Sequence, residues 1–300
     1  MPRFTMMIGL PGSGKSHAAQ ELSAESGAII HSSDSIREEL CGDASEQSIN
    51  KKVFEVLHER VINDLQSGHD VIYDATNIDY KRRMTFLSSL TKIPCEKNCI
   101  FMATPFNVCL ERNKVRKRVV PDEVIEKMYR RIWVPGRYEG WDNIQVDFSP
   151  NSQYFSTLLL FERLCEVPQD NPHHSLTIGG HCAKCSELVS DNFSLEVKVA
   201  ALFHDIGKPF TKTFVDCRGN TSSIAHYYDH QYVSAYDSLF YTGADFDRLY
   251  VANLIQWHMR PFEFERSGVP AKAAEKVKRL LGDKMFSDLM ELHRADVAAH

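Results

Sequence analysis

Short apolar runs alternate with longer amphipathic stretches over the first half of the chain. The runs are rich in Ile, Val, Phe and Met, and they cover residues 4–8, 28–31, 70–73, 98–102 and 144–148. Between them, apolar positions recur at helical spacing over residues 17–26, 48–66, 79–90, 105–113 and 121–132. Buried strands that alternate with helices predict an α/β fold, in which a parallel sheet carries helices on both faces.

The pattern changes after Ser149-Pro150-Asn151. Beyond this point the strand signal fades, and helical periodicity covers residues 154–166, 195–206, 247–258 and 284–299. Nine of the thirteen histidines also lie from His173 onward. We therefore expect two domains, residues 1–150 and 151–300, of which the second is all-α. Its helical pattern reaches the last residues, which is compatible with further chain beyond His300.

A glycine-rich stretch lies between the first strand and the first helix. Residues 9–16 read Gly-Leu-Pro-Gly-Ser-Gly-Lys-Ser. In such a loop the backbone N–H groups of Gly12, Ser13 and Gly14 curl around phosphates, helped by the helix N-terminus that follows. Lys15 is placed to meet the β- and γ-phosphates, and the Ser16 hydroxyl to ligate Mg²⁺. The motif predicts that the chain binds ATP with Mg²⁺.

Composition narrows the class of protein without setting its function. The 300 residues are 43% hydrophobic and 25% charged, which is ordinary for a globular chain, and the net charge is −5. Any nucleic-acid site must therefore be local. Neither a leader-like N-terminus nor an apolar run of about 18 residues is present, and eight scattered cysteines suit a reducing compartment. We expect a cytoplasmic protein, with Cys182 and Cys185 as partly buried thiols on a helix.

Polar residues follow the second and third predicted strands. Asp34 and Arg37 are three residues apart, and Ser33 or Asp34 is expected to cap the helix that carries them. A carboxylate at a strand end can accept a proton from an attacking hydroxyl, and an arginine beside it can grip a phosphate. Asp74 is placed either to hold the Mg²⁺ shell or to orient Arg37. The basic run over residues 110–118 is typical of a solvated face or of a phosphate-neutralising lid.

The stretch from Phe4 to Phe148 resembles the kinase module of polynucleotide 5′-hydroxyl kinases. The shared features are the loop at 9–16, Asp34-x-x-Arg37, the strand end at 74–77, Arg82-Arg83, Arg112-Asn113-x-x-Arg116, Val120-Pro121 and Met128-Tyr129. The resemblance implies that Asp34 is the general base, assisted by Lys15 and Arg116, and that Arg37 contacts a 3′-phosphate of the acceptor. It implies that Arg112 and Arg116 are lid residues on the ATP phosphates, and it places Asp74, Thr76 and Asn77 at the acceptor. The family's contiguous Asp-Thr-Asn is spread here over residues 74–77.

The second half contains an adjacent His-Asp pair at the expected end of an apolar helix. His204 and Asp205 are followed by Gly207, where we expect the helix to stop, and by Lys208, which is placed to meet a phosphate. Imidazole and carboxylate together suit a hydrolytic divalent metal site. Further candidate ligands are His181, Asp296 and, less directly, His226, His230 and His258. His173, His174 and His293 are expected to be framework or substrate-edge residues.

The order His181, His204-Asp205, Asp296 resembles the signature of HD-family metal-dependent phosphohydrolases, particularly the HD module of bacterial CCA-adding enzymes. This resemblance covers roughly residues 168–300. It implies hydrolysis of phosphomonoesters or 2′,3′-cyclic phosphates with a transition metal such as Mn²⁺, Co²⁺ or Ni²⁺. The additional histidines suggest a second ion, because paired ions clamp the attacking and leaving oxygens in such reactions.

Together the two halves predict a bifunctional enzyme that heals nucleic-acid ends. It would phosphorylate 5′-hydroxyl ends and hydrolyse 3′-phosphate or 2′,3′-cyclic phosphate ends. Its substrates would be RNA or DNA ends, with RNA preferred as the expectation, and an RNA ligase would be a partner. One alternative is a nucleoside or metabolite kinase fused to an HD nucleotidase, which the acidic net charge favours. The basic run 112–118, with Arg82-Arg83 and Arg130-Arg131, favours a polynucleotide instead, because these arginines would form a local basic surface. Another is an ATP-gated regulatory module without turnover, which would have no chemical need for Lys15, Asp34, His204 and Asp205.

Overall fold

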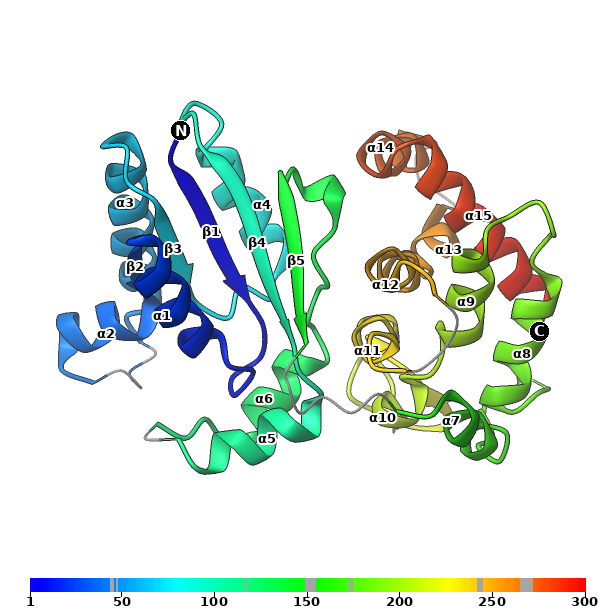
Figure 1. Ribbon diagram of the computed structural model, residues 1–300. Coiled ribbons are helices and arrows are strands. Elements are labelled where there is room, and N and C mark those ends of the chain that lie inside the picture. The colour runs from blue at the N-terminus through cyan, green and yellow to red at the C-terminus, as the bar shows by residue number, and fades with distance from the viewer. Residues whose placement is uncertain are drawn as a thin grey trace. The chain divides into compact units, whose positions relative to one another are not determined.

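The computed structural model describes residues 1–43, 46, 48–116, 118–148, 155–172, 175–241, 245–264 and 272–300. The chain divides into two compact units, Met1–Ser152 and Gln153–His300 (Figure 1). The boundary expected near Pro150 lies outside the described residues, as do His173 and His174. Over the part of the chain that is described, no helix combines the length and apolar character that crossing a bilayer requires.

The first unit is built on a five-stranded parallel sheet, as the alternating pattern predicts. Its strands are β1 (Arg3–Ile8), β2 (Ile29–Ser32), β3 (Val71–Asp74), β4 (Glu96–Ala103) and β5 (Asn143–Phe148), in the order β2-β3-β1-β4-β5. The register pairs Met7 with Asp74, and Asp74 with Ser32. The carboxyl ends of β1, β2 and β3 therefore meet at one edge of the sheet, where α/β proteins place their ligands.

Alternating side chains on the strands pack against helices on both sheet faces. The helices are α1 (Lys15–Ser26), α2 (Ser33–Cys41), α3 (Asn50–Gln66), α4 (Tyr80–Ser89), α5 (Phe106–Lys114) and α6 (Asp122–Tyr129), with a short 3₁₀ turn η1 (Arg137–Glu139). On one face Met7 and Ile72 cluster with Ala19 of α1. On the other, Phe4 and Tyr73 meet the Phe86 ring of α4 at centroid distances of 5.5 and 5.2 Å. This period-two alternation fixes the register of the strands.

Two details of the first unit differ from expectation. The residue that caps α2 is Ser32, whose side chain accepts from the Asp34 N–H at 3.3 Å, rather than Ser33 or Asp34. Arg83 does not add to a basic surface: its side chain and that of Glu139 are fully buried and form a two-point ion pair at 2.8 and 2.6 Å. Arg83 also donates to the Asn77 carbonyl at 2.9 Å, so it supports the loop after β3.

The second unit is mainly helical. Its helices are α7 (Thr157–Leu164), α8 (Ile178–Leu188), α9 (Leu195–Phe203), α10 (Lys208–Thr211), α11 (His230–Ser238), α12 (Arg248–Trp257), α13 (Arg260–Phe264), α14 (Lys272–Leu281) and α15 (Asp283–Ala298). Helix α9 is its centre, in contact with α8, α11, α12 and α15. Its mostly apolar sequence, with Val197, Ala200, Ala201 and Phe203 buried, suits a helix packed by neighbours on several sides.

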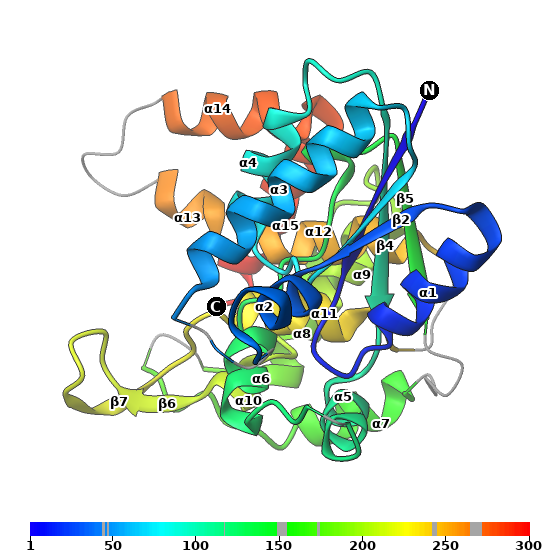
Figure 2. The same cartoon turned by 90° about the vertical axis from the view of Figure 1, so that its left-hand side faces the viewer.

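The expectation of an all-α second domain misses a hairpin. An antiparallel pair, β6 (Thr213–Val215) and β7 (Thr221–His226), projects from the helices of this unit (Figure 2). The Asp216 carboxylate accepts from the backbone N–H of Arg218 and of Asn220 and so closes the turn. Helix α9 also stops at Phe203, with His204 as its C-cap, several residues before Gly207. The His-Asp pair therefore lies in the turn between α9 and α10.

Candidate active sites

The glycine-rich loop of the first unit has the geometry of a phosphate cradle. Gly12 has φ of 81°, and a Cβ atom there would lie 2.4 Å from the carbonyl oxygen of Cys109, so only glycine lets α5 approach the loop this closely. Lys15 Nζ donates to the Leu10 carbonyl at 2.8 Å. Burial lowers the pKa of Lys15 to about 8, although Asp74 and Asp34 act to raise it. A bound phosphate group would place a further negative charge next to this buried ammonium group.

Ser16 and Asp74 form the contact expected of a Mg²⁺ site. The Ser16 hydroxyl donates to Asp74 Oδ2 at 2.8 Å, which joins the start of α1 to the end of β3. A hydroxyl and a carboxylate are hard oxygen ligands of the kind that Mg²⁺ prefers. Of the two roles that the sequence left open for Asp74, this contact favours the one in the Mg²⁺ shell. Its place in the acceptor site stays a prediction.

Thr76 and Asn77 support the loop through hydrogen bonds that involve the backbone. The Thr76 carbonyl accepts from the Gly9 N–H at 3.0 Å, and the Asn77 amide donates to the Met7 carbonyl at 2.8 Å. Asn77 has φ of 48°, a conformation that asparagine tolerates better than most residues. These contacts tie the segment after β3 to β1. The acceptor-binding role expected of both residues stays a prediction.

Asp34 is held by two arginines. Arg37 Nη1 lies 3.0 Å from Asp34 Oδ1, and Arg118 Nη1 lies 2.5 Å from the same oxygen. Arg37 is buried, and its other terminal nitrogen donates to Asn50 Oδ1 at 2.7 Å. Asp34 and Arg116 also act electrostatically on Lys15. The candidate base, the candidate acceptor arginine and the phosphate lysine therefore belong to one charged site.

One buried asparagine connects the end of α5 to Val120. Asn113, at the end of α5, donates to the Val120 carbonyl at 2.7 Å and accepts from the Val120 N–H at 3.0 Å. This pair closes the loop that carries Arg116 and Arg118. Arg112 lies in the last turn of α5. The lid role expected of Arg112 and Arg116 stays a prediction. In the structure, Arg118 of the same basic run is the residue that pairs with Asp34.

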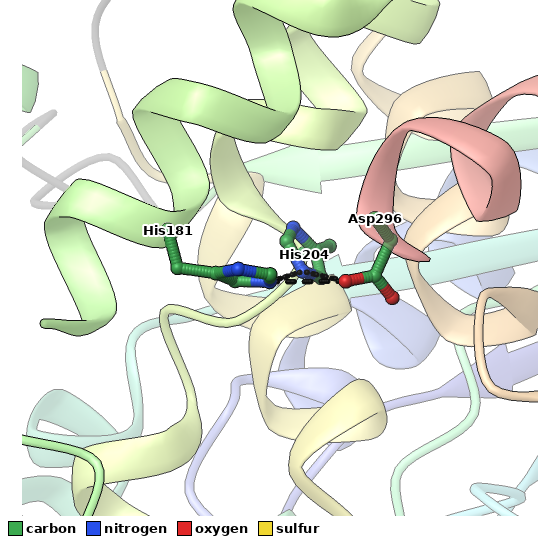
Figure 3. A group of neighbouring side chains, drawn as sticks. All are labelled: His181, His204 and Asp296. Carbon is green, nitrogen blue, oxygen red and sulfur yellow. Dashed lines mark hydrogen bonds and ion pairs between the residues drawn. The ribbon is translucent and has the colours of Figure 1, made fainter. Parts of the chain in front are cut away.

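In the second unit, three residues far apart in the sequence converge on one point. His181 of α8, His204 after α9 and Asp296 of α15 are buried and point toward one another (Figure 3). His181 Nε2 lies 3.0 Å from Asp296 Oδ1 and 3.2 Å from His204 Nε2. These three ligand atoms lie within 4.8 Å of one another. We refer to His181, His204 and Asp296 as the first triad.

A second triad, Asp205, His230 and His258, is joined to the first through Asp205. Asp205 Oδ1 lies 3.1 Å from His230 Nε2, and His230 Nε2 lies 3.2 Å from His258 Nε2. The other oxygen, Oδ2, lies 3.3 Å from His204 Nε2. One carboxylate thus presents an oxygen to each triad. Of the three less direct candidates, His230 and His258 join a triad and His226 belongs to neither.

The imidazoles are oriented by the backbone. The Nδ1 atoms of His204, His230 and His258 lie 2.7, 2.7 and 2.6 Å from carbonyl oxygens three residues earlier. In a neutral imidazole, an Nδ1–H that donates to such a carbonyl leaves Nε2 as the lone-pair nitrogen. In all three residues it is Nε2 that points into a triad. A hydrogen bond of this kind from the second ring nitrogen is typical of metal-ligating histidines.

The charges of the side chains in the two triads suit the binding of cations. Burial alone would raise the pKa of Asp205, but the charges of His204 and Lys208 hold it well below its usual value. Burial would likewise raise the pKa of Asp296, which His204 and His181 keep well below normal. Burial, with His204 and His230 nearby, lowers the pKa of His258 to about 3. Two carboxylates are therefore charged and His258 is neutral at pH 7, as metal ligands need to be. Burial acts to lower the pKa of His204, but the charges of Asp205 and Asp296 hold it well above its usual value. In the absence of metal the His204 imidazolium thus balances these carboxylates, and a metal ion would replace its proton.

The donor set of each triad fits a divalent metal ion. Four buried imidazole nitrogens converge with two ionised carboxylates, and buried charges of this kind are normally paired or coordinate metals. Nitrogen-rich sites with carboxylates suit transition ions better than Mg²⁺. The two triads would each hold one such ion, with Asp205 offering an oxygen to both triads.

A cavity of about 300 Å³ opens beside the triads. Its lining includes Asp205, His230, His258 and Asp296 together with Lys208 and His300. Lys208 Nζ lies 2.6 Å from Asp205 Oδ2 and donates to Gln169 Oε1 at 2.7 Å. Lys208 thus lies at the wall of the cavity, and the contact with a phosphate oxygen that the sequence predicts for it stays a prediction. No motif in the sequence marks Gln169, because its contact in this site is with Lys208, which is distant along the chain.

Cys182 and Cys185 behave as core residues. Both are buried on α8, and burial raises the pKa of each thiol to about 12. At neutral pH they are protonated, so they are poor ligands and poor nucleophiles. They take no part in the metal-ligand groups found among the described residues.

Comparisons with known proteins agree with this division of the chain. Residues 4–135 match the family model of an AAA domain, and residues 173–297 match that of an HD domain. The L-seryl-tRNA(Sec) kinase of Methanococcus maripaludis is 28% identical over 217 residues, which cover 69% of this chain and 80% of the relative.

Two solved structures are also similar in part. One is a Chloroflexus aurantiacus protein whose assignment as a kinase is provisional: it is 17% identical, with a TM-score of 0.42, over 49% of this chain and 85% of the other. The second is a sugar kinase from Janibacter sp. HTCC2649, 16% identical with a TM-score of 0.38, over 49% of this chain and 86% of the other. By its two family matches and its fold, the chain joins an α/β domain of the P-loop kinase fold to a helical HD domain.

Proposed function

We propose that the chain is a bifunctional enzyme that heals RNA ends. Its kinase domain would transfer the γ-phosphoryl group of ATP to a 5′-hydroxyl, and its HD domain would hydrolyse a 3′-phosphate or a 2′,3′-cyclic phosphate. Cleaved RNA often carries a 5′-hydroxyl and a cyclic phosphate, so the two reactions would act on the two sides of one break and prepare them for an RNA ligase.

The observation that carries this proposal is the position of Asp34. Its carboxylate lies between Arg37 and Arg118 and interacts electrostatically with Lys15. In the kinase reaction Asp34 would accept the proton of the acceptor hydroxyl as that oxygen bonds to phosphorus and ADP leaves. Arg37 would hold a phosphate on the acceptor, and Arg112, Arg116 and Lys15 would neutralise the transferring group. The similarity to a kinase named for a tRNA supports an RNA-linked acceptor.

In the HD domain the two triads would hold the metal ions, which would polarise the phosphate ester when bound. Lys208 would bind a non-bridging phosphate oxygen. The hydrogen bonds from Nδ1 to the backbone would keep His204, His230 and His258 facing the ions. The cavity wall would position the rest of the substrate.

A second candidate is a small-molecule kinase joined to an HD nucleotidase. Arg83 is buried against Glu139, and Arg130 pairs with Glu126 at 3.0 Å, so two of the arginines expected to form a basic surface are engaged within the domain. A polynucleotide kinase needs cationic groups along its acceptor strand. The engaged arginines favour a short acceptor.

One experiment separates the two candidates. Transfer of labelled γ-phosphate should be measured to a 5′-hydroxyl RNA oligonucleotide, a nucleoside 3′-monophosphate and a free nucleoside. The RNA-end proposal expects the oligonucleotide to have the highest kcat/KM and the free nucleoside the lowest. A free nucleoside or sugar that outperforms both phosphorylated acceptors would reject RNA-end healing and leave the small-molecule kinase.

A further inference from the structure

The cavity of the HD domain has an aromatic wall that the two triads do not explain. His226, Tyr227 and Tyr228, at the end of β7, line it together with Met259 and Phe262. The same cavity carries Lys208 and the ligand atoms of Asp205 and Asp296. It therefore offers charged groups for a phosphate and flat rings for an apolar, planar group. A nucleotide has both parts.

His226 brings to this wall a polar atom that no other described group satisfies. Its Nε2 atom is buried and has no hydrogen-bond partner among the described residues. Buried polar atoms in proteins are nearly always paired, so an exception at a cavity wall calls for a ligand. Its ring is stacked on that of Tyr228, with centroids 5.4 Å apart and planes 8° from parallel. The nitrogen is thus held in place by a contact that leaves its hydrogen-bonding capacity unused.

Tyr227 and Tyr228 have different roles in this wall. The Tyr227 hydroxyl donates to the Gln169 carbonyl, and its ring lies 5.3 Å from Lys208 Nζ, so Tyr227 helps to place the lysine. Tyr228 is 42% exposed, which leaves ring surface for a further contact. Aromatic rings of this kind stack on nucleobases whatever their sequence.

From these contacts we propose that the HD cavity contains a nucleobase subsite. The base of the terminal nucleotide stacks on Tyr228, His226 Nε2 hydrogen-bonds to its edge or to the ribose, and the phosphate lies at Lys208 and the triads. A volume of about 300 Å³ matches the lower end of small-ligand pockets, which suits one nucleotide. This inference rests on the proposed hydrolase function and names its substrate class as a nucleotide, free or at the end of an RNA.

The test compares phosphate substrates that carry a nucleoside with glycerol phosphates that do not. Uridine 3′-monophosphate is paired with glycerol 2-phosphate, and uridine 2′,3′-cyclic phosphate with glycerol 1,2-cyclic phosphate, all with the Mn²⁺-loaded full chain. Tyr228→Ala should lower kcat/KM for the uridine substrates by about 5- to 100-fold, chiefly through KM, because one stacked base is lost. The glycerol substrates should change less than about twofold. Tyr228→Phe keeps the ring and should retain activity.

His226→Phe separates the nitrogen from the ring. It keeps a stacking partner for Tyr228 but removes Nε2, so it should raise KM for the uridine substrates alone. Phe214→Ala is the matched control, since Phe214 is a 43% exposed aromatic residue on the same hairpin and is not part of the cavity lining. An equal loss on uridine and glycerol substrates in Tyr228→Ala, or no loss on either, would overturn the subsite.

Two further experiments distinguish a failure of the nucleobase subsite from a failure of the proposed hydrolase function. If the wild type hydrolyses none of the four compounds, the hydrolase proposal fails, and binding of uridine 3′-monophosphate decides the subsite by calorimetry in a Lys15→Ala/Arg37→Ala background. Affinity that is unchanged by Tyr228→Ala rejects the subsite, and weakened affinity supports it. An RNA oligonucleotide with a 3′-phosphate distinguishes the sources: a Tyr228→Ala defect on RNA indicates a chain end, and one on the mononucleotide alone indicates a free nucleotide.

Discussion

The Ser16 hydroxyl donates a 2.8 Å hydrogen bond to Asp74 Oδ2. The two residues are 58 positions apart, and they meet because β1 and β3 are neighbouring parallel strands whose carboxyl ends coincide. This contact links the phosphate loop to the strand end that would hold the Mg²⁺ of the nucleotide. It leads directly to the first prediction.

Asp74→Asn should impair the kinase through its metal. The amide keeps the size of the side chain but loses the charge that attracts Mg²⁺, so kcat should fall by about 10- to 100-fold. The Mg²⁺ concentration at half-maximal rate should rise, as measured in a titration at saturating ATP. A variant that loses activity with an unchanged Mg²⁺ dependence would mean that Asp74 acts elsewhere in the site.

Lys15→Ala should lower the rate of phosphotransfer by at least about 100-fold and leave phosphohydrolysis intact. The reason is that Lys15 would contact only the transferring phosphates. The two activities are measured in parallel on one preparation. Loss of both to the same extent would contradict two independent sites.

The same lysine predicts a pH dependence of stability. Its pKa falls from 10.5 to about 8 on folding, mainly through burial. Below pH 8 Lys15 is protonated in both the folded and the unfolded state, and the folded state carries the full free-energy cost of the buried charge. Between pH 8 and 10.5 the unfolded state binds more protons than the folded state. The free energy of unfolding therefore rises with pH over this range. Lys15→Met should remove this rise, worth up to about 3 kcal/mol, in urea unfolding of the nucleotide-free protein. Parallel pH profiles for the variant and wild type would contradict the assignment.

Asp34→Ala should remove phosphotransfer with ATP binding nearly unchanged, as expected of a general base. Arg37→Ala should chiefly raise KM for acceptors that carry a 3′-phosphate, because it removes a contact present in the ground state. Steady-state kinetics on acceptors with and without that phosphate check both. An equal effect of Arg37→Ala on every acceptor would show that its proposed phosphate contact is wrong.

His204→Ala and Asp205→Ala should each eliminate hydrolysis of a 3′-phosphate or a 2′,3′-cyclic end. Elemental analysis should show less bound transition metal, with the larger loss in Asp205→Ala, because Asp205 faces both triads. Chelation should have the same effect, and Mn²⁺, Co²⁺ or Ni²⁺ should restore activity better than Mg²⁺. Kinase activity with fresh Mg²⁺-ATP should stay within a few-fold of the wild type. A His204→Ala protein that retains metal and hydrolysis would refute the role of the first triad.

Arg83→Met should destabilise the kinase domain by about 3–5 kcal/mol, because it leaves the Glu139 carboxylate buried without its partner. Urea unfolding measures the change. Arg60→Met is the matched control: Arg60 forms a similar two-point pair with Glu39, but on the surface, and its loss should leave the unfolding midpoint nearly unchanged. Similar midpoints for the two variants would mean that burial of the Arg83–Glu139 pair does not matter.

The sequence by itself determined the parts of this protein that depend on neighbouring residues. The five strands, the phosphate loop and most of the helices follow from local periodicity and from turn residues. The identities of the first triad and of Asp205 follow from a motif in which order along the chain is enough. The β6–β7 hairpin was missed because its strands are short and half exposed, which leaves little periodic signal.

Only the tertiary structure decided which groups meet. His181 and Asp296 are 115 residues apart, and their 3.0 Å contact exists because α8 and α15 both pack on α9. Arg118 reaches Asp34, and Arg83 is buried rather than basic surface, through contacts that no spacing in the sequence encodes. The same holds for the separate environments of His226 and His230, four residues apart, one at an aromatic wall and the other in a triad. Periodicity records which face of an element is buried; the partner on that face is set by the packing of distant elements.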